Sequence, residues 1–109
     1  MDFETIEEIL KEKNVKYKIR PEEGYGLVEF WTDAAGQDIV AEFEFDGTPE
    51  GFVKKFAEYA DNYDVDDQVR IFVGMLGERG VPNTVRELLD DCQEAKDTLM
   101  GVKEALETA

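Results

Sequence analysis

Apolar residues recur along this chain at two spacings, which divide it into helical and extended segments. Residues 3–13 carry an apolar stripe at helical spacing behind Asp2, a residue type that caps helix N-termini. Residues 15–20 and 38–45 alternate between apolar and polar positions, as half-buried strands do, and residues 26–32 form another strand-like run. Short connections predict that these three strands form an antiparallel meander. The predicted turns between them fall at 21–24 and 35–37.

Two neighbouring aromatic residues in the second predicted strand have to lie on opposite faces of the sheet. Successive side chains of a strand point to opposite sides, so either Phe30 or Trp31 belongs to the core. The other aromatic side chain is then an exposed anchor for a partner, and Phe30 is the better candidate for the core.

The second half of the chain has helical spacing throughout. Thr48 and the proline after it predict a helix start, because threonine caps helices and proline suits their first position. A third helix is predicted from about Asp66 to a stop at Gly80. Residues 84–87 match the Thr-x-x-Glu capping box, which predicts that the last helix begins there. The expected fold is a single α+β domain over residues 1–109: a helix, the meander, and three helices of which the last is long.

The last predicted helix carries an apolar stripe that repeats at alternating intervals of three and four residues, a heptad pattern. Two uses of this stripe are open. It packs against the domain's own core, or it pairs with a second copy and gives a homodimer through Val85–Leu106. Met75, Leu89 and Met100 lie off the main stripes and would widen such an interface. The stripe consists of Val85, Leu88, Cys92, Ala95, Leu99, Val102 and Leu106.

Charged residues are distributed unevenly along the chain. The formal net charge is −15, yet the first twenty residues hold as many bases as acids. No lysine or arginine lies between Arg20 and Lys54. Such a chain repels nucleic acids and anionic membranes and attracts basic surfaces, so the expected partner is a basic protein. The acids of this stretch are Glu22, Glu23, Glu29, Asp33, Asp38, Glu42, Glu44, Asp46 and Glu50.

The residue types that are missing restrict the chemistry. The chain has no histidine and no serine, which excludes Ser-His catalysis and histidine-containing zinc sites. Its one cysteine, Cys92, cannot form an intrachain disulfide and is expected to be a buried, inert thiol. No phosphate-binding loop or nucleophile motif is present, so the chain is predicted not to be an enzyme and to need no cofactor. Without a long apolar run or a signal-peptide pattern, a cytoplasmic location is expected.

The third predicted strand places carboxylates at regular intervals. Glu42 and Glu44 share one face, about 6.7 Å apart, and Asp46 is expected to continue the row. Duplex DNA presents its phosphates on a rigid scaffold, so fixed carboxylates can imitate part of that pattern in a nucleic-acid-binding groove. The alternative is a solvated acidic face that keeps the domain soluble and is partly neutralised by bases of the first strand. Those bases are Lys16, Lys18 and Arg20.

A second acidic cluster lies at residues 61–67. Its spacing does not match a calcium-binding EF-hand, since a loop starting at Asp64 has valine at position six and methionine at position twelve. No metal site is therefore predicted. The expected local role is that Asp64 or Asp66 caps the third helix. Together with Asp67 these residues extend the acidic surface.

A helix at Phe3–Lys13, strands that end in residues 41–45 (Ala-Glu-Phe-Glu-Phe) and a helix at Thr48–Ala60 follow one another in a small acidic chain. This arrangement resembles small acidic anti-CRISPR proteins of mobile genetic elements. In members that block type II effectors, acidic side chains occupy the groove that reads duplex DNA. The resemblance therefore implies a DNA-mimic inhibitor of an RNA-guided effector nuclease in a bacterial cytoplasm. The implied contact residues are Glu29, Asp33, Asp38, Glu42, Glu44, Asp46 and Glu50, extended by Asp64, Asp66 and Asp67.

Other readings of the chain stay open beside this one. Residues 63–69 and 80–91 also resemble uncharacterised short proteins of gut bacterial mobile elements, which implies no activity. One alternative function is a structural or regulatory module that dimerises through its C-terminal helix. Another is an antirestriction protein that acts on a restriction or modification enzyme.

Overall fold

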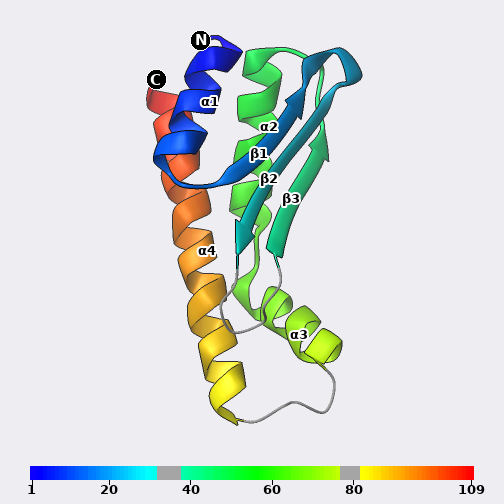
Figure 1. Cartoon of the computed structure of the whole chain (residues 1–109), viewed down its shortest axis with the longest axis vertical. Helices are drawn as coiled ribbons and strands as arrows, with labels where there is room; N and C mark the ends of the chain where they lie inside the picture. The colour runs from blue at the N-terminus through cyan, green and yellow to red at the C-terminus, as the bar shows by residue number, and fades with distance from the viewer. Residues whose placement is uncertain (32–37, 77–81) are drawn as a thin grey trace.

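The computed structural model describes residues 1–31, 38–76 and 82–109, of which residues 31, 75, 76 and 82–84 are described by their backbone only. A helix, a three-stranded antiparallel sheet and three further helices follow in order, so the predicted α+β fold is confirmed (Figure 1). The elements are α1 (Phe3–Glu12), β1 (Lys16–Arg20), a single 3-10 turn η1 (Pro21–Glu23), β2 (Tyr25–Trp31), β3 (Asp38–Glu44), α2 (Pro49–Asn62), α3 (Val65–Leu76) and α4 (Pro82–Thr108).

The sheet has the order β1-β2-β3, with both strand pairs antiparallel. Its inner face supplies buried residues such as Val28, Ile39 and Ala41, and Phe30 is partly buried against the same core. The helices α1, α2 and α4 pack on this inner side (Figure 1). The outer face carries the polar members of the alternating pattern. The prediction of which positions face the core is therefore confirmed.

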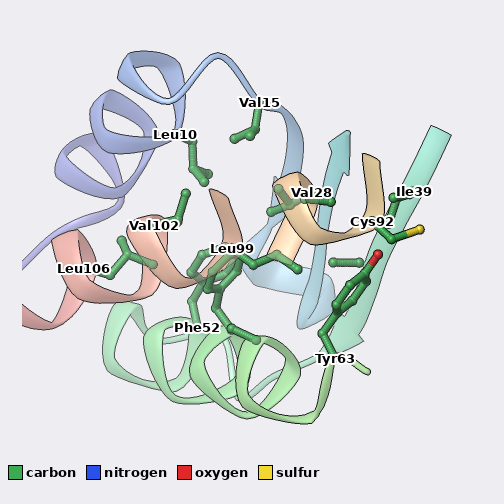
Figure 2. Packing of buried hydrophobic residues seen from close by; sticks show 14 of the residues in the cluster. Leu10, Val15, Val28, Ile39, Phe52, Tyr63, Cys92, Leu99, Val102 and Leu106 are labelled. Carbon is green, nitrogen blue, oxygen red and sulfur yellow. The ribbon is translucent and has the colours of Figure 1, made fainter. Parts of the chain in front are cut away.

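Aromatic rings connect the sheet to α2. The ring centroid of Phe52 lies 5.2 Å from that of Phe43 and 5.5 Å from that of Phe45. Gly26 of β2 makes this approach possible, because a Cβ atom there would lie 2.8 Å from Cε2 of Phe43. On the other side of the core, Leu10 of α1 points toward Val102 of α4 (Figure 2). The core therefore joins both ends of the chain to the sheet.

The apolar stripe of α4 is used within the chain. A homodimer through this helix would have to use its outer side, where Val85, Leu89 and Met100 are exposed. The expectation that the stripe packs against the chain's own core is therefore confirmed for all but its first member. The buried members are Leu88, Cys92, Ala95, Leu99, Val102 and Leu106.

Two lysines of α4 attach it to α2. Nζ of Lys96 donates to the carbonyl oxygen of Ala60. Nζ of Lys103 lies 2.6 Å from Oδ1 of Asp61. The hydrogen bond with Asp61 raises the pKa of Lys103, which keeps this contact charged throughout the neutral range. These contacts fix the position of α2, which forms one wall of a groove beside β3.

Helix caps were predicted well at the first two helices and wrongly at the last. Asp2 accepts a hydrogen bond of 2.9 Å from the backbone of Thr5, and Thr48 accepts one of 3.0 Å from Gly51. The last helix begins at Pro82 rather than after Thr84.

The competing start signal explains this correction. Proline lacks an N–H group and has a fixed φ, so Pro82 suits the first position of a helix. It is therefore as good a start signal as the capping box that begins two residues later. Val85 then falls in the first turn of α4, beyond the end of the sheet, and is 38% exposed rather than part of the core (Figure 1). The predicted turn at 35–37, the predicted stop at Gly80 and the candidate contact residue Asp33 lie outside the described residues.

Candidate functional site

The outer face of the sheet separates basic from acidic side chains. Exposed bases line β1, and the exposed carboxylates of Glu42 and Glu44 line β3. Leu27 of β2 lies opposite both Lys18 and Glu42, so the two charged rows are two strand spacings apart, about 9.6 Å. Within the described ranges, neither Glu42 nor Glu44 forms an ion pair. The predicted separation of these carboxylates from the bases of β1 is therefore confirmed.

Tyr25 of β2 holds one of these carboxylates. It lies opposite Glu44 in the strand register, and its hydroxyl forms a hydrogen bond with the diagonal neighbour Glu42. Desolvation raises the pKa of Tyr25, and the hydrogen bond with Glu42 raises it further. Tyr25 is therefore a neutral neighbour of the β3 carboxylates.

Glu29 and Asp38 come together at the end of the outer face nearest to the connection between β2 and β3. Glu29 pairs with Val40 and Asp38 with Trp31, so the two carboxyl groups are diagonal neighbours. Their hydrogen bond, which requires a shared proton, raises the pKa of Glu29, as do desolvation and the charge of Asp38, while Lys16 lowers it. Glu29 therefore takes up a proton more readily than an isolated glutamate does.

The acids that follow β3 belong to the start of α2. Oδ1 of Asp46 accepts hydrogen bonds from the hydroxyl of Thr48 at 2.6 Å and from its backbone N–H at 2.9 Å. These two bonds lower the pKa of Asp46. Because β3 ends at Glu44, Asp46 is fixed at the helix start and does not continue the row from Glu42, which corrects the expectation from the sequence. Glu50 is exposed in the first turn of α2.

A groove of about 640 Å³ lies beside β3, between α2 and the start of α3. Four carboxylates and one lysine contribute to its lining, so it is acidic. At its α3 end, Oδ1 of Asp64 accepts a hydrogen bond of 3.1 Å from the N–H of Asp67, so Asp64 rather than Asp66 caps the helix. The lining residues are Phe43, Glu44, Lys55, Glu58, Tyr59, Asn62, Tyr63, Asp64, Asp67 and Gln68.

The acids at 61–67 do not converge on a common point. Asp61 is bound to Lys103, Asp64 caps α3, and Asp67 lies 3.3 Å from Arg70. Over residues 1–31, 38–76 and 82–109, no group of three or more acidic or thiol side chains is arranged to hold a metal ion. The cluster therefore contributes charge to the groove and its rim.

The groove was not predicted from the sequence. Glu58 and Tyr59 lie on α2 beside the buried positions Phe56 and Ala60, so helical spacing could have placed them at the margin of the core. Spacing alone cannot say which strand they meet. That depends on how α2 crosses the sheet, which is set by the packing of Phe52 against the strands.

Comparisons of this chain with protein-family models, with curated proteins and with solved structures gave no match. The resemblance to anti-CRISPR proteins therefore stays a prediction, and the function has to be argued from the surface itself. None of the helices in the described part of the chain has the length and apolar character needed to cross a bilayer.

Proposed function

We propose that this chain is an acidic DNA-mimic inhibitor that binds the basic nucleic-acid groove of a bacterial defence nuclease, with an RNA-guided effector nuclease as the favoured target. The observation that carries this proposal is the position of Glu42 and Glu44. Both are exposed on a strand, and both are separated from the bases of β1 by a full strand. Arginine and lysine side chains in a groove that normally holds phosphates meet these carboxylates instead. The role of each carboxylate is charge, not catalysis.

The carboxylates of β3 are held by a rigid scaffold. Each alternates with a residue that faces the core, since Ala41 is fully buried and Phe43 packs against Phe52. Little main-chain ordering is then needed on binding, and a preorganised surface loses less free energy when it docks. This rigidity distinguishes the β3 row from charges on a flexible tail.

The acids on and beside β3 lie at one margin of the sheet. Glu42 and Glu44 on β3 and the carboxylates of the adjacent groove lie on the side of the sheet opposite to β1. A partner that approaches from this side meets acids, whereas one that approaches β1 meets bases. We therefore place the docking surface around β3 and leave β1 outside the contact.

Binding to a purified, guide-loaded effector nuclease tests this proposal. Affinity is measured with and without competing target duplex, from about 50 mM to about 500 mM salt. The double variant Glu42→Lys/Glu44→Lys is expected to bind at least about tenfold more weakly at physiological salt, equivalent to ~1.4 kcal/mol. The matched control is Glu8→Lys/Glu12→Lys, which changes net charge equally on the exposed side of α1. This control is expected to change affinity by less than about threefold, since its charges lie away from β3.

Different results would reject charge mimicry. Equal losses in the two double variants would show that net charge alone matters, and affinity that does not depend on salt would show that carboxylates do not carry the contact. Binding that duplex DNA does not displace would place the contact outside the groove. A parallel panel of restriction and modification enzymes distinguishes the antirestriction alternative, because selective binding to one of them would replace the effector nuclease as the target.

A further inference from the structure

The strand β3 has an open edge. It is the last strand of the sheet, and its backbone N–H and C=O groups point alternately toward β2 and away from it. The N–H of Phe45 bonds to Gly24, next to β2, at 2.8 Å, so the groups of Val40, Glu42 and Glu44 point away. Within the described part of the chain, no other strand pairs with this edge, and α2 reaches it from the inner side of the sheet.

One contact marks the inner margin of this edge. The hydroxyl of Tyr59 on α2 donates to the carbonyl oxygen of Val40 at 3.3 Å. This bond shows that the outward carbonyl groups of β3 are accessible to a donor. It occupies the carbonyl oxygen of Val40 near the start of β3, and it leaves the N–H and C=O groups of Glu42 and Glu44 to a partner.

The charged side chains on this edge determine which strands can pair with it. An exposed edge strand is a template for further strands, and charged side chains are a common protection against self-association. A second copy paired through β3 would bring Glu42 and Glu44 close to their own counterparts, and like charges across a strand pair are destabilising. A strand with lysine or arginine at these positions gains from the same geometry.

The groove provides room for the other face of such a strand. It lies beside β3 and extends from Glu44, at the end of the strand, to Asp64 and Asp67 at the start of α3. Side chains of an added strand alternate between the outer face of the sheet and this groove. The groove offers the ring of Phe43 for apolar contact and carboxylates for basic side chains.

We propose that the edge of β3 binds an extended, lysine- or arginine-rich segment of the partner protein as a fourth strand of the sheet. Basic side chains of that segment lie opposite Glu42 and Glu44, and the intervening side chains enter the groove. This proposal deepens the proposed function, on which it rests in requiring a basic partner. It adds main-chain hydrogen bonds to the contact between charges.

A pair of peptides tests the strand addition. The probe is a capped peptide of alternating lysine and valine, about as long as an average strand of 5–6 residues. Its control has the same charge and side chains but carries N-methyl groups on the backbone nitrogens that would face β3. Hydrogen exchange of the amides of Glu42 and Glu44 is measured by NMR. At a free concentration about ten times its Kd, the unmethylated peptide is expected to slow their exchange about tenfold, and the methylated peptide is not.

A variant of the chain tests the charge selection on the same edge. Glu42→Gln/Glu44→Gln keeps both backbone N–H groups and removes both charges, so it is expected to weaken peptide binding several-fold while amide protection persists at saturation. Glu8→Gln/Glu12→Gln on α1 is the control for net charge. Circular dichroism establishes that each variant is folded.

The outcomes separate this proposal from the proposed function. Equal binding of the two peptides, or no slowing of exchange at Glu42 and Glu44, would overturn strand addition while leaving the binding of the intact nuclease to be judged on its own assay. Failure of both peptides to bind at low salt would overturn it as well. Protection that appears without peptide as protein concentration rises would assign the edge to a second copy of this chain, and would also reject the proposal.

Discussion

At the level of single residues, the carboxyl pair of Glu29 and Asp38 stands apart from the other acids. Its shared hydrogen bond raises the pKa of Glu29 above the ordinary value of 4.5. The folded chain therefore holds a proton that the unfolded chain has already released, so stability rises as pH falls through the raised pKa. Above that pKa the two carboxylates repel each other and lower the stability of the fold. Below pH 4.5 Glu29 is protonated in both the folded and the unfolded chain, so this loss of stability disappears.

Replacing Glu29 should therefore stabilise the protein in a pH-dependent way. Glu29→Gln is expected to raise Tm at about pH 7 and to lose this advantage near pH 4, where carboxyl groups become protonated in both states. The measurement is thermal unfolding followed by circular dichroism across that range. Glu104→Gln, an exposed substitution on α4, controls for the change in net charge. A gain of equal size in both variants at every pH would contradict the role of the pair.

At the level of elements, the contact between β2, β3 and α2 depends on a missing side chain. A Cβ atom on Gly26 would lie 2.8 Å from Phe43 and 3.0 Å from Phe52. Both rings are held by further aromatic contacts, since Phe52 also packs against Phe45 and Phe56. The sheet and the helix therefore approach as closely as a glycine allows, and this distance sets the position of α2 beside β3.

Adding a methyl group at this point is expected to weaken the fold. Gly26→Ala should lower the free energy of unfolding by about 1–3 kcal/mol, because overpacking outweighs the ~0.4–1 kcal/mol gained from a less flexible unfolded chain. Urea unfolding measures the change. Gly74→Ala in α3 is the matched control, since its Cβ would meet nothing within 4 Å. This control should stabilise the protein by about 0.5–1 kcal/mol through helix propensity. A neutral result at Gly26 would show that α2 can move away from the sheet.

The predictions that the structure confirms depend on residues that are close together in the sequence. Alternation in β3 places Ile39 and Ala41 in the core and Glu42 outside, and this needs no knowledge of distant residues. The cap at Thr48 is equally local. The start of α4 was misplaced because two start signals stand within a few residues, and spacing cannot decide between them.

The features that were missed depend on distant parts of the chain. Glu29 meets Asp38 only because of the register between β2 and β3, which is set by the whole strand pair. The groove lies where α2 meets β3, and Tyr59 of α2 bonds to Val40, 19 positions earlier in the sequence. Helical and strand periodicity identify the face on which a residue lies, but they do not identify the element that it meets.

At the level of the whole molecule, the net charge of −15 opposes folding. Exposed carboxylates repel one another over a distance set by the Debye length, which falls from about 30 Å at 10 mM salt to about 8 Å at physiological ionic strength. Folding brings these charges closer together, so screening favours the folded state. The acidic surface is thus maintained at the expense of stability.

Stability should therefore increase with added salt. Tm is expected to rise by several degrees between about 10 mM and about 150 mM sodium chloride, as measured by calorimetry. The variant Glu8→Lys/Glu12→Lys, with lower net charge, should show a shallower rise. A Tm that falls with salt would mean that attractive ion pairs outweigh repulsion. Light scattering on the same samples establishes whether the chain stays monomeric, which separates this effect from dimerisation through α4.

The order of charges across the sheet also gives its outer face an electric dipole moment. With Lys18 at one margin and Glu42 at the other, the body of the sheet carries the positive and negative ends of this dipole on opposite edges. The field of an approaching polycation exerts a torque on such a body and turns the β3 margin forward before the surfaces touch. Encounters are then aligned in advance rather than random, so a larger fraction of collisions begins in a productive orientation.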